Sequence, residues 1–311
     1  MNIVELGRST VKTKSKWKVN KNSVMATVSG IGYLTPSILL FTIFLFYPMI
    51  RTIYLSMFLT DAQGKTIEYV GLENFTYLLS SPSFLNSVKS TLLFVIYTVP
   101  VGVALALMLA LLANVKLRGI HFFRTIFSST MGMSVAASSV IWMFMYNPTI
   151  GIINQFLSLI GLEKVQWLLD PSTALVAVSL ATIWMNTGFS FLILLGGLQN
   201  IDKQLYESAN IAGVSTFYQL RKITIPILSP TLFFVSTVSL INAFQTFGQI
   251  DILTKGGPIE STNVIVYSIY KDAFINYNIG SASAQAVILF FFMIIMTFIQ
   301  FKFGERKVHY Q

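Results

Sequence analysis

The chain has 311 residues, of which 54% are hydrophobic and only 11% are charged, and its mean hydropathy is +0.69. Soluble domains carry about 25% charged residues, so this chain is too poor in charge to cover a globule in water, and a lipid bilayer is its expected solvent. It has no cysteine, and its two histidines, His121 and His309, lie far apart. The sequence therefore offers no catalytic thiolate, no disulfide framework, and no HExxH or cysteine-based metal site.

Six stretches are apolar and long enough to cross a membrane, which takes about 20 residues for a helix. The third continues past Tyr146, where Asn147-Pro148 breaks the run, and we end its helix there. The sequence thus predicts an all-α membrane protein with six transmembrane helices in one domain over residues 29–305. The predicted spans lie at about residues 30–55, 91–114, 123–146, 173–198, 227–251 and 277–302.

Lysine and arginine indicate how the chain is oriented. With a cytoplasmic N-terminus, 15 of the 21 basic residues fall in inner segments, as the positive-inside rule favours. Both termini are then cytoplasmic, and residues 1–28 and 306–311 form an inner basic segment and an inner tail. We expect the first of these to be disordered, because it is rich in Lys, Ser and Thr.

Two outer loops carry short amphipathic patterns, at residues 71–89 and 152–162. Amphipathic stretches of this kind are typical of helices that lie in the membrane interface. We expect both to be interfacial helices beside the bilayer.

The inner loop at residues 199–226 is the most polar part of the chain between two spans. Asp202 is placed to cap a first helix, because its carboxylate can accept amide hydrogens of the first turn. Gly213 is placed as the left-handed residue that stops that helix. Thr216 and Gln219 have the spacing of a capping box for a second helix, which Pro226 would end or kink.

This inner loop resembles the cytoplasmic docking loop of the membrane subunits of bacterial ABC importers. That loop reads E-A-A, three residues, G, nine residues, then I-x-L-P, and this chain has the same spacing with Ser208 and Ile225 as departures. The resemblance implies that the loop binds a cleft of an ATP-hydrolysing subunit and couples it to transport. The implied docking residues are Glu207, Ser208, Ala209, Gly213, Ile223 and Pro226.

Other segments extend the resemblance. Residues 69–79, "YVGLENFTYLL", are similar to an outer loop of the family, and "TKGGP" is similar to a turn of its carbohydrate-uptake branch. The last forty residues are similar to glycerol-3-phosphate permeases of the first-subunit type. The turn would face the solute-binding protein through Gly256, Gly257 and Pro258.

The resemblance implies a type I ABC importer permease in the bacterial cytoplasmic membrane. Its partners would be a homologous second permease, two ATPase subunits and an extracytoplasmic solute-binding protein. It would bind no nucleic acid and need no cofactor of its own, because ATP and Mg would be bound by the ATPase. The implied solute is glycerol-3-phosphate or a related glycerophosphodiester.

Polar side chains within spans are costly and usually face the bundle interior, so they are candidates to line a path. They also serve as hydrogen bonds between helices, and the sequence leaves both interpretations open. Asn242, Gln245 and Gln249 have helical spacing i, i+3, i+7, which predicts one amide face in the fifth span. The complete candidate set is Trp184, Asn186, Asn242, Gln245, Gln249 and Gln285.

No lysine or arginine lies in the middle of a predicted span, although glycerol-3-phosphate is an anion. A neutral sugar or oligosaccharide is therefore the alternative solute. A stand-alone secondary transporter or channel is a more distant alternative, since such proteins often carry charged residues in mid-membrane. An intramembrane enzyme would need an acid–base pair or a nucleophile inside a span, and the sequence has neither.

Overall fold

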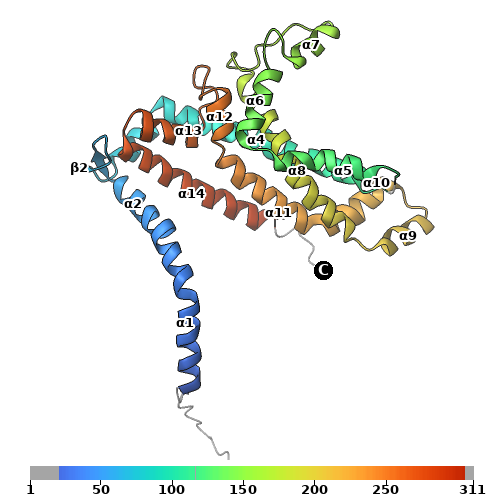
Figure 1. Cartoon of the computed structure of the whole chain (residues 1–311), viewed down its shortest axis with the longest axis horizontal. Coiled ribbons are helices and arrows are strands. Elements are labelled where there is room, and N and C mark those ends of the chain that lie inside the picture. The colour runs from blue at the N-terminus through green and yellow to red at the C-terminus, as the bar shows by residue number, and fades with distance from the viewer. Residues whose placement is uncertain (1–20, 116, 305–311) are drawn as a thin grey trace, which may run out of the picture. The chain divides into compact units, whose positions relative to one another are not determined.

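The structure is a computed structural model, and it describes residues 21–115 and 117–304 (Figure 1). The predicted inner tail at 306–311 lies outside these residues, as does most of the segment predicted at 1–28. The described chain forms two compact units, one that ends at Arg51 and one that begins at Thr52.

The first unit is helical throughout its described part. α1 (Lys21–Phe41) passes through a π-helical turn, η1 (Thr42–Phe46), into α2 (Tyr47–Leu55). Helix begins at Lys21, whereas the sequence predicts a disordered segment over residues 1–28. All side chains at 31–50 are exposed within this chain, so a long apolar surface is available to lipid or to another protein.

The second unit begins with the last residues of α2, and a small β-hairpin follows that the all-α prediction missed. β1 (Phe58–Thr60) pairs antiparallel with β2 (Thr66–Tyr69), and α3 (Glu73–Ser80) follows. The connecting turn is stabilised by the Asp61 carboxylate, which accepts the amides of Gln63 and Lys65 at 3.0 and 2.8 Å. Strands of three and four residues are too short to show the alternating pattern from which strands are predicted.

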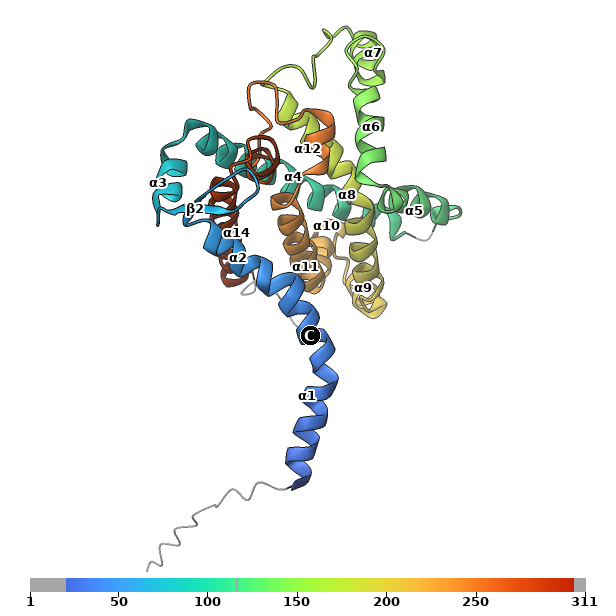
Figure 2. The same cartoon turned by 60° about the vertical axis from the view of Figure 1, so that its left-hand side comes forward.

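Four long helices form the centre of the second unit and are apolar enough to cross a membrane. Among them α4 contacts α8 and α11, and α11 also contacts α8 and α14 (Figures 1 and 2). The first of them begins earlier than the predicted span at 91–114. The four are α4 (Pro82–Ala113), α8 (Ala174–Gln199), α11 (Ile225–Phe244) and α14 (Ile279–Gly304).

The contact between α4 and α8 sets small residues of α4 against larger side chains of α8. Ala106 and Ala110 are fully buried in one cluster with Phe191 and Leu194, and a Cβ on Gly102 would lie 3.9 Å from Ile183. Water is absent from the hydrocarbon region, so helices there associate through close packing, and small residues let their backbones approach. α8 is the most deeply buried of the long helices in the described chain.

The span predicted at 123–146 is broken into two helices. α5 (Ile120–Ser128) leads through a 3-10 turn, η2 (Ser129–Gly132), to α6 (Val135–Met145), and the two parts meet at 108° (Figure 2). Ser134 starts the second part, because its hydroxyl accepts the amide of Ala137 at 3.2 Å. The described chain therefore has five unbroken candidate spans, or six if this bent pair counts as one.

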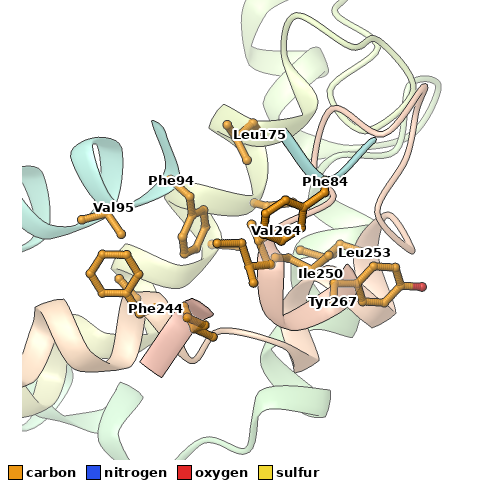
Figure 3. Close-up of a cluster of buried hydrophobic side chains, with 14 of the residues drawn as sticks. Phe84, Phe94, Val95, Leu175, Phe244, Ile250, Leu253, Val264 and Tyr267 are labelled. Carbon is orange, nitrogen blue, oxygen red and sulfur yellow. The ribbon is translucent and has the colours of Figure 1, made fainter. Parts of the chain in front are cut away.

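Shorter helices pack at the end of the unit that holds the hairpin. α12 (Gly248–Leu253) lies apart from α11, so the span predicted at 227–251 ends at Phe244. α13 (Ile265–Tyr270) continues into a π-helical turn, η4 (Lys271–Ile275), and α7 (Ile152–Leu159) follows α6. Figure 3 shows the cluster that joins α12 and α13 to the long helices, including Phe84, Phe94, Phe244, Ile250, Val264 and Tyr267.

A second buried cluster lies near the other end of α4 and α8. It includes Ala113, Phe191, Leu198 and Leu228, all at most 2% exposed. Ile201 joins this cluster from the beginning of the inner loop. The inner loop is therefore attached directly to packed core.

Replacement of Gly188 by alanine is expected to destabilise the fold. An added Cβ would lie 2.5 Å from the Thr130 hydroxyl and 2.8 Å from the Met131 amide, closer than side-chain atoms can pack. Overpacking of this kind costs about 1–3 kcal/mol, so the unfolding midpoint in detergent should fall. Gly196→Ala on the same helix is the control, because its Cβ would meet no atom within 4 Å. Equal midpoints for the two variants would contradict this account.

Candidate functional site

The inner loop begins with the short helix that the sequence predicts. α9 (Lys203–Ile211) is capped by Asp202, whose carboxylate accepts the amide of Gln204 at 2.9 Å. Gly213 stops the helix with φ +70°, and the amide of Val214 bonds back to the Ala209 carbonyl at 3.0 Å. Both local predictions, the N-cap and the left-handed glycine, are confirmed. They succeed because each depends on residues within one helical turn.

The second helix of the loop starts one residue earlier than the predicted capping box. The Ser215 hydroxyl accepts the amide of Tyr218 at 3.4 Å, so Ser215 is the cap and Thr216 is the first residue of α10 (Thr216–Gln219). The helix then continues through a π-helical turn, η3 (Leu220–Thr224), into α11. The sequence predicts that Pro226 ends or kinks this helix, and the helix does not end there. The proline stands in the first turn of α11, where a missing amide is tolerated.

Two side chains fasten the halves of the inner loop together. Gln219 is buried, and its amide donates to the Asn210 side chain at 2.8 Å and to the Val214 carbonyl at 2.9 Å. The hydroxyls of Tyr206 and Thr224 are hydrogen-bonded at 2.9 Å. Because these contacts join α9 to the start of the α11 helix, the loop is a closed unit fixed to a long helix.

The outward surface of the inner loop mixes apolar and polar side chains. Ile211 is 89% exposed and Phe217 is 72% exposed, although both are large apolar residues. Glu207 and Ser208 are exposed beside them, and Ala209 is partly buried. Exposed apolar residues grouped with a carboxylate are typical of a surface that binds another protein. The remaining docking candidates lie close by, with Ile223 and Pro226 partly buried.

A polar pocket of about 190 Å³ lies between α4, α8 and α11. The side-chain amides of Asn186 and Asn242 both line it, so two of the predicted path residues come together. Neither amide has a hydrogen-bond partner among the described residues. We call this the amide pocket. Its other polar lining residues are Thr98, Thr182, Thr187, Ser190 and Ser239, and its apolar ones are Val99, Gly102, Ile183, Phe189, Val238 and Ala243.

The predicted row of three amides does not form. α11 ends at Phe244, so Gln245 follows the helix and Gln249 belongs to α12. Gln245 is exposed and does not line the amide pocket. Gln249 is 4% exposed and donates to the sulfur of Met185 at 3.4 Å, which is a contact between helices.

The two remaining path candidates also lie outside the amide pocket. Trp184 packs edge-to-face on Trp142, with ring centroids 5.9 Å apart, beside an apolar cavity. Gln285 is 1% exposed, and its amide donates to the Asp272 carboxylate, which also accepts from the Ser281 hydroxyl at 2.9 Å. These contacts favour the structural role that the sequence left open for Gln285.

The turn Gly256–Pro258, which is predicted to face the binding protein, is held by contacts with residues that follow it. Gly256 has φ +78°, and a Cβ there would lie 2.8 Å from the Tyr267 ring. The Thr262 hydroxyl donates to the Gly257 carbonyl at 2.7 Å, and the Gly257–Pro258 bond is cis. Ile259 projects from the turn and is 88% exposed.

The serines and threonines of the amide pocket could not be found from the sequence. Three of their hydroxyls, on Thr98, Thr182 and Thr187, donate to the carbonyl four residues earlier, as threonines in helices commonly do. The described residues contain no group of three or more His, Cys, Asp or Glu that could hold a metal ion.

Residues 74–309 match the family described as binding-protein-dependent transport system inner membrane component. A relative from Agrobacterium fabrum named sn-glycerol-3-phosphate transport system permease protein UgpA is 39% identical over 280 residues, which cover 89% of this chain and 94% of the relative. The protein of that name from Yersinia enterocolitica is 33% identical over 288 residues, which cover 91% and 97%.

Solved structures show the same fold. A bacterial alginate ABC transporter, in complex with an alginate pentasaccharide-bound periplasmic protein, has a chain with a TM-score of 0.80 and 23% identity. The match covers 92% of this chain and 96% of that chain. The MetNI methionine ABC transporter, in an inward-facing form, matches with a TM-score of 0.53 and 16% identity over 76% of this chain and 99% of the other.

Proposed function

Because this chain belongs to the family of binding-protein-dependent transport system inner membrane components, we propose that it forms half of the path by which an ABC importer moves glycerol-3-phosphate or a related glycerophosphodiester. The main support for the proposal is the inner loop. Hydrogen bonds hold its two helices together, it has an exposed apolar surface, and it leads into α11, which lines the amide pocket. The chain acts as a transport subunit, and a partner subunit hydrolyses ATP.

The inner loop is the docking site for that ATPase. Glu207 offers a carboxylate to a basic partner, and Ile211 and Phe217 offer apolar surface that would leave water on binding. Gln219 joins α10 to α9, and the Tyr206–Thr224 hydrogen bond joins α9 to the turn that enters α11. A displacement of α9 therefore moves the helix that carries Asn242. ATP then biases transport through the different affinity of the ATPase for two positions of this lever.

The amide pocket is part of the translocation path. Free amides of Asn186 and Asn242 can exchange hydrogen bonds with solute hydroxyls, and Phe189 offers a ring face for C–H groups. The solute is inferred from the relatives named as sn-glycerol-3-phosphate permeases, which share 33–39% identity with nearly the whole chain. A neutral sugar is the second candidate, because no charged residue lines this pocket.

The complete importer would contain a homologous second permease, two ATPase subunits and a solute-binding protein outside. We place the chain in the bacterial cytoplasmic membrane with both termini inside, which puts the inner loop in the cytoplasm. The turn Gly256–Pro258 then faces the binding protein, and its exposed neighbour Ile259 is available for contact. ATP and Mg belong to the ATPase.

The proposal is tested by uptake into proteoliposomes that contain the complete importer with ATP inside. Glycerol-3-phosphate, a glycerophosphodiester and a neutral disaccharide are supplied in turn with the binding protein. ATP-dependent uptake of the phosphate compounds alone is expected. Uptake of the disaccharide alone would overturn the assigned solute and retain the importer, and absence of ATP-dependent uptake of all three would overturn both.

In the same assay, Asn186→Leu combined with Asn242→Leu should lower uptake about thirtyfold, because two amides worth roughly 1 kcal/mol each are lost from the path. Gln245→Leu is the matched control, since this exposed amide lies outside the pocket. The assembled complex should be recovered in equal amounts for all variants. Normal uptake by the double variant would assign both amides to packing.

Gly213→Val should uncouple ATP hydrolysis from transport, because a β-branched residue resists the φ of +70° that turns the chain between α9 and α10. Gly213→Asn is the control, since asparagine tolerates that conformation. ATPase activity that is no longer stimulated by loaded binding protein is expected for valine alone. If both variants retain stimulated hydrolysis and uptake, the turn is not part of the coupling lever.

A further inference from the structure

A second polar pocket, also of about 190 Å³, lies at the end of α4 far from the inner loop. It is several times larger than the roughly 30 Å³ that one water occupies in the liquid, so it can hold a small solute group. Among its lining residues, which all belong to the described chain, Lys89 alone carries a charge. We call it the outer pocket. Its polar lining consists of Asn86, Lys89, Ser90, Tyr97, Ser172 and Ser261.

The positive charge of Lys89 is not neutralised within the described chain. The ion pair found there joins Lys271 to Glu260 at 3.4 Å, and the Ser83 hydroxyl also donates to that carboxylate at 2.9 Å. The other nearby carboxylate, Asp170, accepts the amide and the hydroxyl of Ser172 at 2.8 and 2.7 Å. Both carboxylates are thus engaged, and neither lines the outer pocket.

Further groups around the pocket favour an anion. The Ser261 hydroxyl oxygen is buried and has no hydrogen-bond partner among the described residues. α8, a 26-residue helix, begins beside the pocket without a side-chain cap, and Leu175 in its first turn lines the cavity. The Ala174 amide bonds to the Asp170 carbonyl at 3.0 Å, and the positive end of the helix dipole attracts anions. The Tyr97 hydroxyl adds one more donor.

The outer pocket and the amide pocket lie on the same seam between α4 and α8. Ser90 of the outer pocket and Thr98 of the amide pocket are eight residues apart on α4, which is about 12 Å along the helix. Leu175 and Thr182 of α8 have a spacing of seven residues. The turn over the outer pocket is held by Asn86, whose amide donates to the Glu260 carbonyl at 2.9 Å.

We propose that the outer pocket is an entry site that binds the phosphate ester of the incoming solute through Lys89, before the solute reaches the neutral amide pocket. The inference rests on the proposed function and deepens it. It explains how a path without a charge at its centre can select an anionic solute, because the selection takes place one step earlier. A phospholipid headgroup carries the same chemistry, so the experiment separates these two sources.

The direct test uses the absence of cysteine from this chain. Tyr97→Cys places a single thiol at the outer pocket, in complexes whose other subunits carry no reactive cysteine. Inorganic phosphate and glycerol-3-phosphate should each slow modification of this thiol about tenfold, through a charge-assisted contact with Lys89. Glycerol should not. Addition of Lys89→Gln should abolish the protection, and addition of Lys164→Gln, at another exposed lysine, should leave it intact.

This test does not depend on transport, so its failure is distinct from failure of the proposed function. Protection by phosphate that survives Lys89→Gln, or no protection at all, would overturn the proposal even if uptake is normal. In uptake assays, Lys89→Cys should lower transport of glycerol-3-phosphate about tenfold, and a thiol reagent that adds an ammonium group should restore it. A reagent that adds a sulfonate should not. Equal effects of the two reagents would contradict an electrostatic role.

The lipid source is separated by repeating the protection assay in membranes made of phosphate-free glycolipid. A substrate site should give the same protection by glycerol-3-phosphate in both kinds of membrane. If thiol modification is slow in phospholipid, fast in glycolipid and insensitive to glycerol-3-phosphate in both, the pocket holds a lipid headgroup and the proposal is wrong.

Discussion

The close contact of α4 with α8 is the interaction on which the rest of the structure depends. Alanines of α4 let the larger side chains of α8 pack closely in a solvent that offers neither water nor a hydrophobic driving force between helices. At one end, the two helices form the core against which Ile201 anchors the inner loop. Further along, polar side chains of both helices line the amide pocket and the outer pocket. The contact between α4 and α8 thus contributes to the packed core and also borders the proposed path.

In the proposed importer, the inner loop connects this seam to the ATPase. It leaves α8 at Gln199 and returns as the helical segment that becomes α11, so its two ends are the two helices that flank the amide pocket. The hydrogen bonds of Gln219 keep the loop from absorbing a displacement by bending. A force applied to α9 therefore moves helix ends, and the π-helical turn over Leu220–Thr224 lies between the loop and α11.

Local features of the loop could be predicted from the sequence, and features made by distant residues could not. Asp202 and Gly213 were predictable because a cap and a left-handed stop are set within one turn. Ser215, rather than Thr216, proved to be the second cap, a shift of one residue that spacing rules do not resolve. The tie through Gln219 depends on Asn210 lying opposite it, which only the folded loop determines.

The spans show the same division. Apolar length predicted the long helices, but the break before Ser134 carries no charge and no proline and was invisible to a hydropathy reading. The end of α11 at Phe244 was missed for a similar reason, and it moved Gln245 and Gln249 off the expected face. Asn186 and Asn242 meet only because α8 packs on α11, so their pairing required the structure.

In the proposed importer, nucleotide binding to the ATPase docked at the inner loop changes the state of the amide pocket. Ser239→Cys would place a single thiol on α11 in that pocket, in a chain that otherwise has none. The measurement is the rate at which a membrane-impermeant reagent, added outside, modifies this thiol in the complete importer with and without trapped ATP. We predict a severalfold faster reaction with ATP bound, and the difference should be lost in Gly213→Val. A rate that is independent of nucleotide would contradict the coupling of the loop to the path.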